Sequence, residues 1–457
     1  MQKSKENHSG EVILGHNRTA LECVAVAQLS VRPGDPRRFS QQDIALATAV
    51  VRQMPPDAPL PIVVNDNHEI MVGGLFVQAT RKLGLKQINV IRHAGLSRIE
   101  EQQYSVAINQ LLSKGGWDPG ALDVWIREFE ASIEDFSHES LGFSNGELDR
   151  ILGIHDVVAG LDSEEALPPA ETVAISQHGS IWQVGRHTIM VGDANSPADM
   201  RRLMAGHMAA LALTDPPFGC KVDGFVSKKG KHRDFVEGAG DKSPEELESF
   251  FSQFAMNLLP VLRAGALVYV FIDWRSLDLL LRACEKQFGR LVQFCCWVKD
   301  RAGMGSFYRS QHELVLVFRV PGAGHINNIQ LGRHGRNRSN VWNYPAAASS
   351  RKGREGDMLE KHPTPKPVEL IADAILDCTA HGDRIIDCFL GSGTALIAAE
   401  RTGRICHGMD LDPLYVDVAI RRWQAWTGLT ATDAETGRSF DEIAAEAALQ
   451  EEHGDVE

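Results

Sequence analysis

The chain has 457 residues, of which 43% are hydrophobic and 23% are charged, and its formal net charge is −13. A chain of this length can form two or three domains with their own cores, and the composition is that of a globular protein. No apolar run is as long as a membrane span, and residues 1–11 are too polar for a secretory signal, so a cytoplasmic protein without membrane contact is expected. The eight cysteines form no C-x-x-C pair, and no metal site is expected.

Residues 1–20 are polar and are expected to be disordered. From residue 21 to residue 155, short runs typical of strands alternate with runs typical of helices, which predicts a small α+β domain. Strands are predicted at residues 24–31, 61–64, 69–72 and 88–91, and helices at residues 41–53, 75–83, 97–112 and 121–129. A linker is predicted at residues 156–175, where Pro168-Pro169 lies in an acidic stretch.

The pattern changes over residues 176–430, where apolar strands recur with helical runs between several of them. Strands are predicted at residues 187–191, 211–214, 266–272, 291–298, 314–320, 384–386 and 405–409. This order predicts an α/β domain with a mostly parallel, doubly wound sheet. Residues 322–354 interrupt it with Gly, Asn, Arg and Ser, and residues 431–457 are expected to form an acidic C-terminal tail, a helix with a frayed end.

The peptide Asp215-Pro216-Pro217-Phe218 directly follows the predicted strand at residues 211–214. It suits chemistry at an exocyclic amino group, whose nitrogen lone pair is delocalised into the base. The Asp215 carboxylate and the Pro216 carbonyl can accept the N–H groups, while the two prolines fix the turn. The Phe218 ring can stack on a base that has left the helix. A plain turn is the alternative, and the peptide alone does not exclude it.

A second motif lies much later in the chain, where Asp387-Cys388-Phe389-Leu390 leads from a strand into Gly391-Ser392-Gly393-Thr394. A tight Gly-Ser-Gly turn lets the backbone approach a nucleotide-like ligand, and the helix from Thr394 offers it free N–H groups. Phosphate binding is a rival use of such a turn, but the sequence has no G-x-x-x-x-G-K-[ST] run. Asp410 ends the next predicted strand, where a carboxylate can accept both hydroxyl groups of a ribose.

Together, and in this order, the two motifs resemble those of the beta group of amino-methyltransferases that act on DNA. The resemblance covers roughly residues 181–428 and includes the peptide His362-Pro363-Thr364-Pro365-Lys366-Pro367. It implies a Rossmann-like, S-adenosylmethionine-dependent methyltransferase domain with a circularly permuted motif order. It also implies a direct displacement that is favoured by positioning and needs no metal.

The resemblance also implies cofactor-binding roles for individual residues. The amino-acid half of S-adenosylmethionine is expected to meet Asp387, Phe389, Gly391, Ser392, Gly393 and Thr394. Asp410 is implied to bind the ribose, and Thr364 and Lys366 to meet the methionine end. Asp193, after the predicted strand at residues 187–191, is implied to bind the adenine amino group of the cofactor. A capping Asp before the helix that begins near Pro197 is the alternative.

Two basic runs flank the predicted active site, although the chain is acidic overall. The candidate DNA-binding residues in them are Lys228, Lys229, Lys231, Arg333, Arg336 and Arg338. Phosphate contacts need only a local basic face, so double-stranded DNA is the expected partner and residues 322–354 are the expected target-recognition insertion. Two solvated loops are the alternative. The sequence leaves a homodimer open.

Residues 24–115 resemble the ParB/sulfiredoxin-like module that is often found ahead of such methylases. The matching peptides include Pro33-Gly34-Asp35-Pro36-Arg37 and His68-Glu69-Ile70-Met71-Val72-Gly73-Gly74. Members with nucleotide or nuclease chemistry usually carry G-H-x-R or G-E-R-R at the loop that opens the next helix, where this chain has Gly73-Gly74-Leu75-Phe76. The module is therefore expected to dock DNA or protein rather than to catalyse a reaction.

These observations predict a site-specific DNA methyltransferase that modifies adenine at N6. D-P-P-F resembles the adenine group more than the cytosine-N4 group, whose first residue is usually Ser, and cytosine-N4 methylation is one alternative. Another is a non-catalytic, ParB-like DNA-binding regulator that keeps the methyltransferase fold as a platform. The intact Asp215, Gly391 and Asp410 speak against that alternative. Methylation of RNA or protein is a weaker third.

Overall fold

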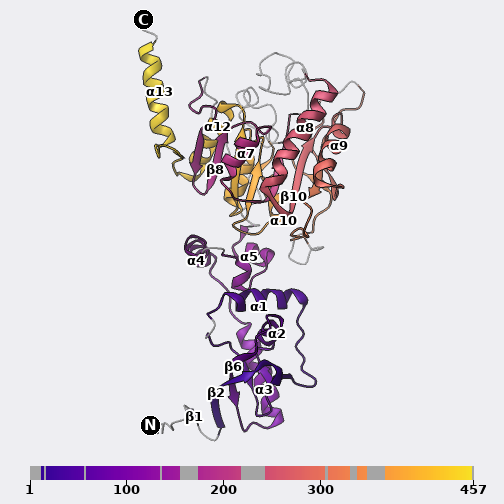
Figure 1. Ribbon diagram of the computed structural model, residues 1–457, viewed down its shortest axis with the longest axis vertical. Helices are drawn as coiled ribbons and strands as arrows, with labels where there is room; N and C mark the ends of the chain where they lie inside the picture. Colours follow the sequence, from indigo (N-terminus) through magenta and orange to yellow (C-terminus); the bar gives the residue numbers. More distant parts are fainter. Residues whose placement is uncertain are drawn as a thin grey trace. The chain divides into compact units, whose positions relative to one another are not determined.

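The computed structural model of the chain describes residues 12–14, 17–55, 58–133, 136–154, 173–217, 242–303, 307–329, 337–346 and 366–454. The chain divides into two compact units, Met1–Leu152 and Gly153–Glu457 (Figure 1). Within the described ranges, every helix is too short or too polar to cross a membrane.

The N-terminal unit is built on a six-stranded sheet with the order β1-β2-β6-β4-β5-β3. Its strands are β1 (Val12–Leu14), β2 (Asn17–Ala25), β3 (Ser30–Val31), β4 (Val63–Val64), β5 (Glu69–Val72) and β6 (Gln87–His93). The single strand predicted at residues 24–31 is wrong, because the short helix η1 (Val26–Gln28) separates β2 from β3. Disorder over the whole of residues 1–20 is also wrong, since β1 and the start of β2 lie there.

The helices of this unit follow the predicted pattern closely. They are α1 (Gln41–Gln53), α2 (Gly74–Lys82), α3 (Arg98–Leu112), α4 (Pro119–Ser132), η2 (His138–Leu141) and α5 (Asn145–Ile151). Ser40 and Ser97 begin α1 and α3 with capping boxes. Gly73 has φ of 82°, and a Cβ on it would lie 2.5 Å from the Pro61 carbonyl oxygen. The close approach of two backbone segments therefore explains the glycine at this position.

The C-terminal unit is built on a ten-stranded sheet with the order β13-β11-β12-β10-β9-β14-β15-β8-β7-β16. Its strands are β7 (Ile181–Val184), β8 (His187–Val191), β9 (Ala209–Thr214), β10 (Leu262–Ile272), β11 (Gln293–Val298), β12 (His312–Arg319), β13 (Val341–Asn343), β14 (Arg384–Asp387), β15 (Ile405–Asp410) and β16 (Thr432–Asp433). The five central strands, from β10 to β8, are parallel, and antiparallel pairs flank them on both sides. The predicted mostly parallel α/β sheet is thus confirmed.

The helices of this unit pack against the sheet. They are α7 (Pro197–Met204), α8 (Pro244–Leu258), α9 (Leu277–Phe288), α10 (Val368–Cys378), α11 (Thr394–Arg401), α12 (Pro413–Thr427) and α13 (Phe440–Gly454), with the short helix η4 (Leu259–Val261). Helices α8 and α9 lie side by side against β10 (Figure 1), where Phe251, Phe254 and Leu280 are fully buried in one core with the strand residues.

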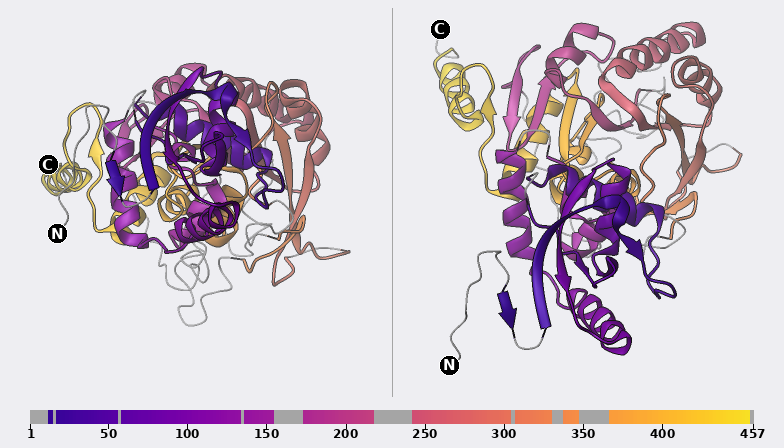
Figure 2. Two further views of the ribbon diagram at one scale, coloured as in Figure 1. Left: turned by 90° about the horizontal axis from the view of Figure 1, so that it is seen from below. Right: turned by 60° about the horizontal axis from the view of Figure 1, so that its bottom comes forward.

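The C-terminal segment is more firmly attached than the prediction of a tail from residue 431 implied. Strand β16 pairs with β7, and Phe440 is buried with its ring 5.1 Å from that of Trp182. After Phe440, helix α13 stands off the edge of the sheet (Figure 1), and the C-terminus lies at its far end (Figure 2). Residue 431 therefore does not mark the end of the folded unit.

Candidate active site

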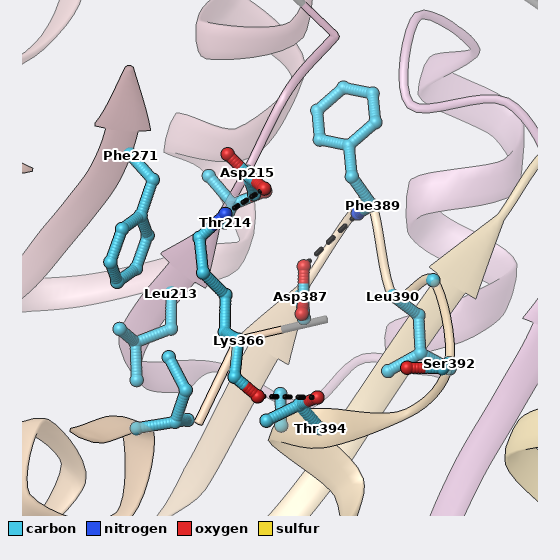
Figure 3. Close-up of a pocket in the computed structure, with 13 residues that line it drawn as sticks. Leu213, Thr214, Asp215, Phe271, Lys366, Asp387, Phe389, Leu390, Ser392 and Thr394 are labelled. Atoms are coloured by element: carbon cyan, nitrogen blue, oxygen red, sulfur yellow. Dashed lines mark hydrogen bonds and ion pairs between the residues drawn. The ribbon is translucent and has the colours of Figure 1, made fainter. Parts of the chain in front are cut away.

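The carboxyl ends of four adjacent parallel strands bring four aspartates to one edge of the sheet. Asp215 directly follows β9, while Asp387 and Asp410 are the last residues of β14 and β15. Asp193 comes just after β8, the next strand in the sheet. In open α/β sheets this edge is where ligands bind. The residues that line a pocket here are Leu213, Thr214, Asp215, Phe271, Lys366, Ile371, Asp387, Phe389, Leu390, Gly391, Ser392, Thr394 and Ala395 (Figure 3).

The side chain of Lys366 crosses this pocket and ends at Asp215 (Figure 3). Its ammonium group donates a short hydrogen bond to Oδ2 of Asp215 and lies 5.2 Å from the centre of the Phe271 ring. The other oxygen of Asp215, Oδ1, is buried and has no hydrogen-bond partner among the described residues. Asp215 is therefore held in place by Lys366 through one oxygen, while its second oxygen is available to an N–H group in the pocket.

Two further charged side chains, Glu313 and Lys299, extend the ion pairs beyond Lys366. The Lys366 ammonium lies 3.1 Å from Oε2 of Glu313, whose Oε1 accepts a 2.5 Å hydrogen bond from Lys299. Lys299 also stands over the Trp297 ring, 4.8 Å from its centre. Four alternating charges thus run from Asp215 to the end of β11.

Glu313 and Lys299 are site residues that the sequence did not reveal. Glu313 lies on β12, and Lys299 comes directly after β11. The two side chains meet because these strands pair with Val298 opposite His312. Only that register, which depends on the tertiary structure, brings them to Lys366.

The buried position of these groups shifts their ionisation. Burial raises the pKa of Asp215, although the Lys366 ammonium opposes the shift. Burial also disfavours ionised Glu313, but Lys366 and Lys299 outweigh it and lower the pKa of that residue. For Lys366, the two carboxylates outweigh burial and raise its pKa, so the lysine stays charged. Asp215 is therefore the carboxylate of the cluster with the greater tendency to take a proton.

Asp387 and Asp410 form a second, cation-poor group of carboxylates. Burial, together with the charges of Asp215 and Asp410, raises the pKa of Asp387 to about 7. Burial raises the pKa of Asp410 to about 6. Asp387 accepts a hydrogen bond from the Phe389 backbone at 3.1 Å, and Asp410 accepts one from the Gly391 backbone at 2.8 Å. A ligand with positive charge would stabilise the ionised forms of both.

The two glycines of the turn have different roles. Gly391 has φ of 51°, and a Cβ built on it would meet no described atom within 4 Å, so this residue faces open space at the pocket. Gly393 has φ of 82°, and its Cβ would lie 2.7 Å from that of Ala419 in α12. Gly393 therefore permits close packing of α11 on α12, whereas Gly391 leaves room for a ligand.

The remaining predicted cofactor residues of the turn surround the same space. Phe389 is half-buried, and its ring packs 5.6 Å from that of Phe254, so it forms an apolar wall of the pocket. Ser392 and Thr394 are buried, and the Thr394 hydroxyl donates to the Lys366 carbonyl at 3.3 Å. This bond joins the turn to the segment that carries Lys366.

Asp193 lies at the same sheet edge but does not line the pocket. Its Oδ1 accepts a 2.8 Å hydrogen bond from the Asn195 backbone, so it stabilises its own turn. The neighbouring Gly192 donates a 2.9 Å bond to the Asp410 carbonyl. Asp193 thus stabilises the turn just after β8, next to the end of β15, whereas Ser196 caps the helix α7.

Several predicted site residues lie outside the described residues. They are Phe218, Lys228, Lys229, Lys231, Arg333, Arg336 and Thr364. Pro216 is buried and Pro217 is half-buried, directly after Asp215.

The structure argues against a DNA contact by Arg338. Its guanidinium binds Asp373 at 2.7 Å and Asp377 at 3.1 Å, both on α10, and it donates to the Tyr344 hydroxyl at 2.6 Å. Only 16% of the Arg338 side chain is exposed. Because this charge links the residues just before β13 to α10, Arg338 is an internal structural residue, and not the exposed basic residue that the sequence predicted.

Known proteins share sequence similarity with about half of this chain. The sequence profile of a DNA methylase family matches residues 209–421. The type II methyltransferase M2.DpnII of Streptococcus pneumoniae is 26% identical over 225 residues, which cover 47% of this chain and 82% of that protein. M.HpaI of Haemophilus parainfluenzae is 26% identical over 233 residues, covering 46% and 67%.

Among solved structures, the M1.HpyAVI–SAM complex matches with a TM-score of 0.36 and 18% identity, over 51% of this chain and 98% of that one. The cytosine-N4-specific PvuII DNA methyltransferase matches with a TM-score of 0.39 and 16% identity, covering 60% and 93%. The chromosome-partitioning protein ParB of Caulobacter crescentus matches with a TM-score of 0.25 and 15% identity, covering 30% and 79%.

The matched region holds the Asp-Pro-Pro peptide after β9, the Gly-rich turn after β14 and the carboxylate that ends β15. It begins at the first residue of β9 and ends within α12, so it spans the pocket and the strands that build it. Residues 209–421 of this chain are therefore similar to the N6/N4 DNA methylase family over the strands and turns that build the pocket.

Proposed function

We propose that this protein transfers a methyl group from S-adenosylmethionine to the N6 amino group of adenine in double-stranded DNA. The observation that carries the proposal is Oδ1 of Asp215, a buried acceptor that no described residue hydrogen-bonds, in the same pocket as the Gly-rich turn. An exocyclic amine that enters this pocket finds an acceptor for its N–H group beside the groups suited to the methyl donor.

The pocket residues fit S-adenosylmethionine, which supplies a sulfonium methyl group for direct displacement. Its amino and sulfonium groups are positive, and Asp387 and Asp410 are buried carboxylates whose raised pKa values mark a shortage of cations. Gly391 leaves open space beside them, and Phe389 provides an apolar wall. These four residues would hold the cofactor.

Asp215 has two tasks in the transfer. Its Oδ1 accepts an N–H of the target amine and so orients the nitrogen toward the methyl donor, which is the main source of rate in a positioned displacement. After the methyl group has moved, the amine must lose a proton. The raised pKa of Asp215 suits it to take that proton. Lys366 holds the carboxylate in position through its other oxygen.

We favour adenine over cytosine as the target base because of the residue that begins the catalytic peptide. Asp215-Pro216-Pro217-Phe218 resembles the adenine group, whereas cytosine-N4 enzymes usually begin with Ser. The similarity to type II methyltransferases supports a role in DNA modification. Cytosine-N4 methylation by the same pocket is the second candidate, since the two nitrogens need the same acceptors.

The test is to identify the methylated nucleoside directly. The purified chain is incubated with unmethylated genomic DNA and methyl-deuterated S-adenosylmethionine, and the DNA is digested and measured by mass spectrometry. We expect labelled N6-methyladenine, and none with an Asp215→Ala variant. Labelled N4-methylcytosine would instead support the second candidate, cytosine-N4 methylation. DNA binding without any label would favour the non-catalytic regulator, and label in RNA or protein alone would overturn the choice of DNA.

A further inference from the structure

Two aromatic side chains are exposed on a hairpin beside the active site. Phe307 and Tyr308 are 86% and 84% exposed, more than the other large hydrophobic side chains that the structure describes. Their ring centres are 4.4 Å apart, so the two rings form one apolar projection. Exposed apolar groups of this size in a folded protein mark interaction sites.

The hairpin that carries these rings is joined by hydrogen bonds between its described parts, residues 299–303 and 307–311. It continues the β11–β12 pair, with the Lys299 backbone donating to the Gln311 carbonyl at 2.9 Å and that of Gly303 donating to the Ser310 carbonyl at 2.7 Å. The guanidinium of Arg309 donates to the Gly303 carbonyl at 2.8 Å. Backbone and side-chain hydrogen bonds therefore hold the described parts of the hairpin that exposes the two rings to solvent.

The hairpin projects from the sheet edge that carries Asp215. Strand β12 starts opposite the end of β10, with Leu314 facing Ile272, and β10 runs parallel to β9, with Val270 beside Thr214. The base of the hairpin is also tied to the catalytic residue, because Lys299 binds Glu313, which binds Lys366, which binds Asp215.

Other groups at this edge suit a nucleic acid. Within residues 299–311 Lys299 is paired with Glu313, but Arg301 has a side chain that is 69% exposed, and Arg309 adds a further positive charge. Just after β10, Trp274 is 55% exposed and carries the Arg275 guanidinium 4.9 Å from its ring centre. Aromatic faces with nearby cations are the surfaces on which bases stack.

We infer that Phe307 and Tyr308 enter the DNA duplex at the target site and fill the space that the extruded base leaves. This inference rests on the proposed function. A base can reach Oδ1 of Asp215 only after it has left the helix, and the gap in the stack then loses its base–base contacts. Rings on this hairpin beside the pocket replace those contacts and hold the duplex open.

The experiment compares substrates that differ only in how much opening they need. The modified site is first mapped in DNA from cells that express the full chain. Two duplexes with that site are then made, one with the target base paired and one with it opposite an abasic position. The double variant Phe307→Ala/Tyr308→Ala is compared with the unchanged protein. Leu429→Ala is the matched control, since Leu429 is 57% exposed and follows α12, which returns from the active edge to the opposite one.

We expect the double variant to lose about tenfold or more in kcat/KM on the paired duplex, the size expected from losing aromatic stacking on a base. On the abasic duplex it should stay within about twofold of the unchanged protein, because that base is already unpaired. Cofactor affinity, measured by calorimetry, should not change. Phe307→Trp/Tyr308→Trp should keep most of the activity on the paired duplex.

An equal loss on both duplexes, or no loss on either, would overturn the inference. So would a similar loss with Leu429→Ala. Failure of the proposed function is distinguishable, because the unchanged protein would then methylate neither duplex. A fluorescent adenine analogue at the target position adds a readout besides activity, since its emission should rise on extrusion with the unchanged protein and rise less with the double variant.

Discussion

Lys366 is paired with Asp215 across 151 residues of sequence, and both lie in the pocket that also contains the Gly-rich turn. The resemblance to known methylases assigned Lys366 to the methionine end of the cofactor. In the structure its ammonium group contacts Asp215 and Glu313, and its contact with the cofactor stays a prediction. This lysine therefore connects the catalytic peptide after β9 with β12, and its main effect is on the position and charge of Asp215.

Replacing Asp215 by alanine should remove methyl transfer and leave cofactor binding nearly unchanged. Asp215 offers its acceptor to the target amine, whereas the groups suited to the cofactor belong to the turn and to Asp410. Loss of a positioned acid–base group costs about 10²-fold to 10⁴-fold in rate. Single-turnover kinetics and calorimetric titration with S-adenosylmethionine separate the two effects. A loss of cofactor affinity as large as the loss of rate would contradict this division of roles.

Lys366→Met should destabilise the protein and change its pH dependence. It leaves the buried carboxylates of Asp215 and Glu313 without their shared cation, which costs about 3–5 kcal/mol in the free energy of unfolding. The pKa of each carboxylate should rise, so that a higher pH is needed to ionise it and the acid limb of the pH–rate profile moves upward.

Urea unfolding and a pH–rate profile measure the two effects. Adding Glu313→Gln to Lys366→Met removes one of the two carboxylates that lost their contact with Lys366 and should recover part of the stability. Unchanged stability in the single variant would show that the ion-pair chain is not needed for the fold.

Cofactor affinity should weaken as the pH falls below about 7, because Asp387 and Asp410 then take protons that a cationic ligand must displace. Between about pH 8 and pH 5 we expect at least a tenfold loss of affinity. Asp387→Asn should bind more weakly at pH 8 and show a flatter profile. Calorimetry over this range is the measurement, and a pH-independent affinity in the unchanged protein would count against these carboxylates.

The raised pKa of Asp387 predicts that the cofactor-free protein loses stability as the pH rises, whereas cofactor affinity increases. A carboxyl whose pKa is raised by folding stabilises the folded state below its unfolded pKa, and this contribution is lost as the pH rises through its folded pKa, about 7 for Asp387. Asp387→Asn should therefore raise the Tm at pH 8 relative to the unchanged protein and have no such effect at pH 4. Thermal unfolding at the two pH values tests this.

The two glycines of the turn should respond differently to substitution. Gly393→Val should lower stability, since its Cβ would overlap Ala419 of α12. Gly391→Ala places a methyl group at the pocket in a left-handed backbone conformation, which costs about 1–2 kcal/mol and should weaken cofactor binding more than packing. Thermal unfolding and calorimetry on both variants distinguish the roles. Normal cofactor affinity in Gly391→Ala would exclude this turn as a close ligand contact.

Arg333 and Arg336 should be separable from Arg338 by salt dependence. If the first two contact phosphates, their joint replacement by alanine flattens the slope of log K against log salt by about 1.8, or 0.9 per contact. Arg338→Met should instead lower stability by about 3–5 kcal/mol, because it leaves Asp373 and Asp377 unpaired. DNA titrations at several salt concentrations and urea unfolding compare the variants. If Arg338→Met flattened the slope of log K against log salt and left the stability unchanged, Arg338 would count as a DNA-binding residue after all.

The sequence by itself was enough to place the strands of the central sheet and the two motifs at their ends. These features are local: an apolar run that is buried on both faces is visible in a few residues, and a Gly-Ser-Gly turn or a Pro-Pro peptide restricts its own backbone. Because parallel strands end at one edge of a sheet, Asp215, Asp387 and Asp410 could be expected together.

Only the tertiary structure decided which charges meet. The pairing of Lys366 with Asp215 and Glu313, the use of Arg338 between β13 and α10, and the contact of Gly393 with Ala419 join residues far apart in the chain. Local patterns carry no information on strand register or on helix packing, since both are set by the fit of distant surfaces. A lysine before a helix and an arginine in a polar loop have the same sequence signature whether they bind a ligand, a phosphate or a buried carboxylate.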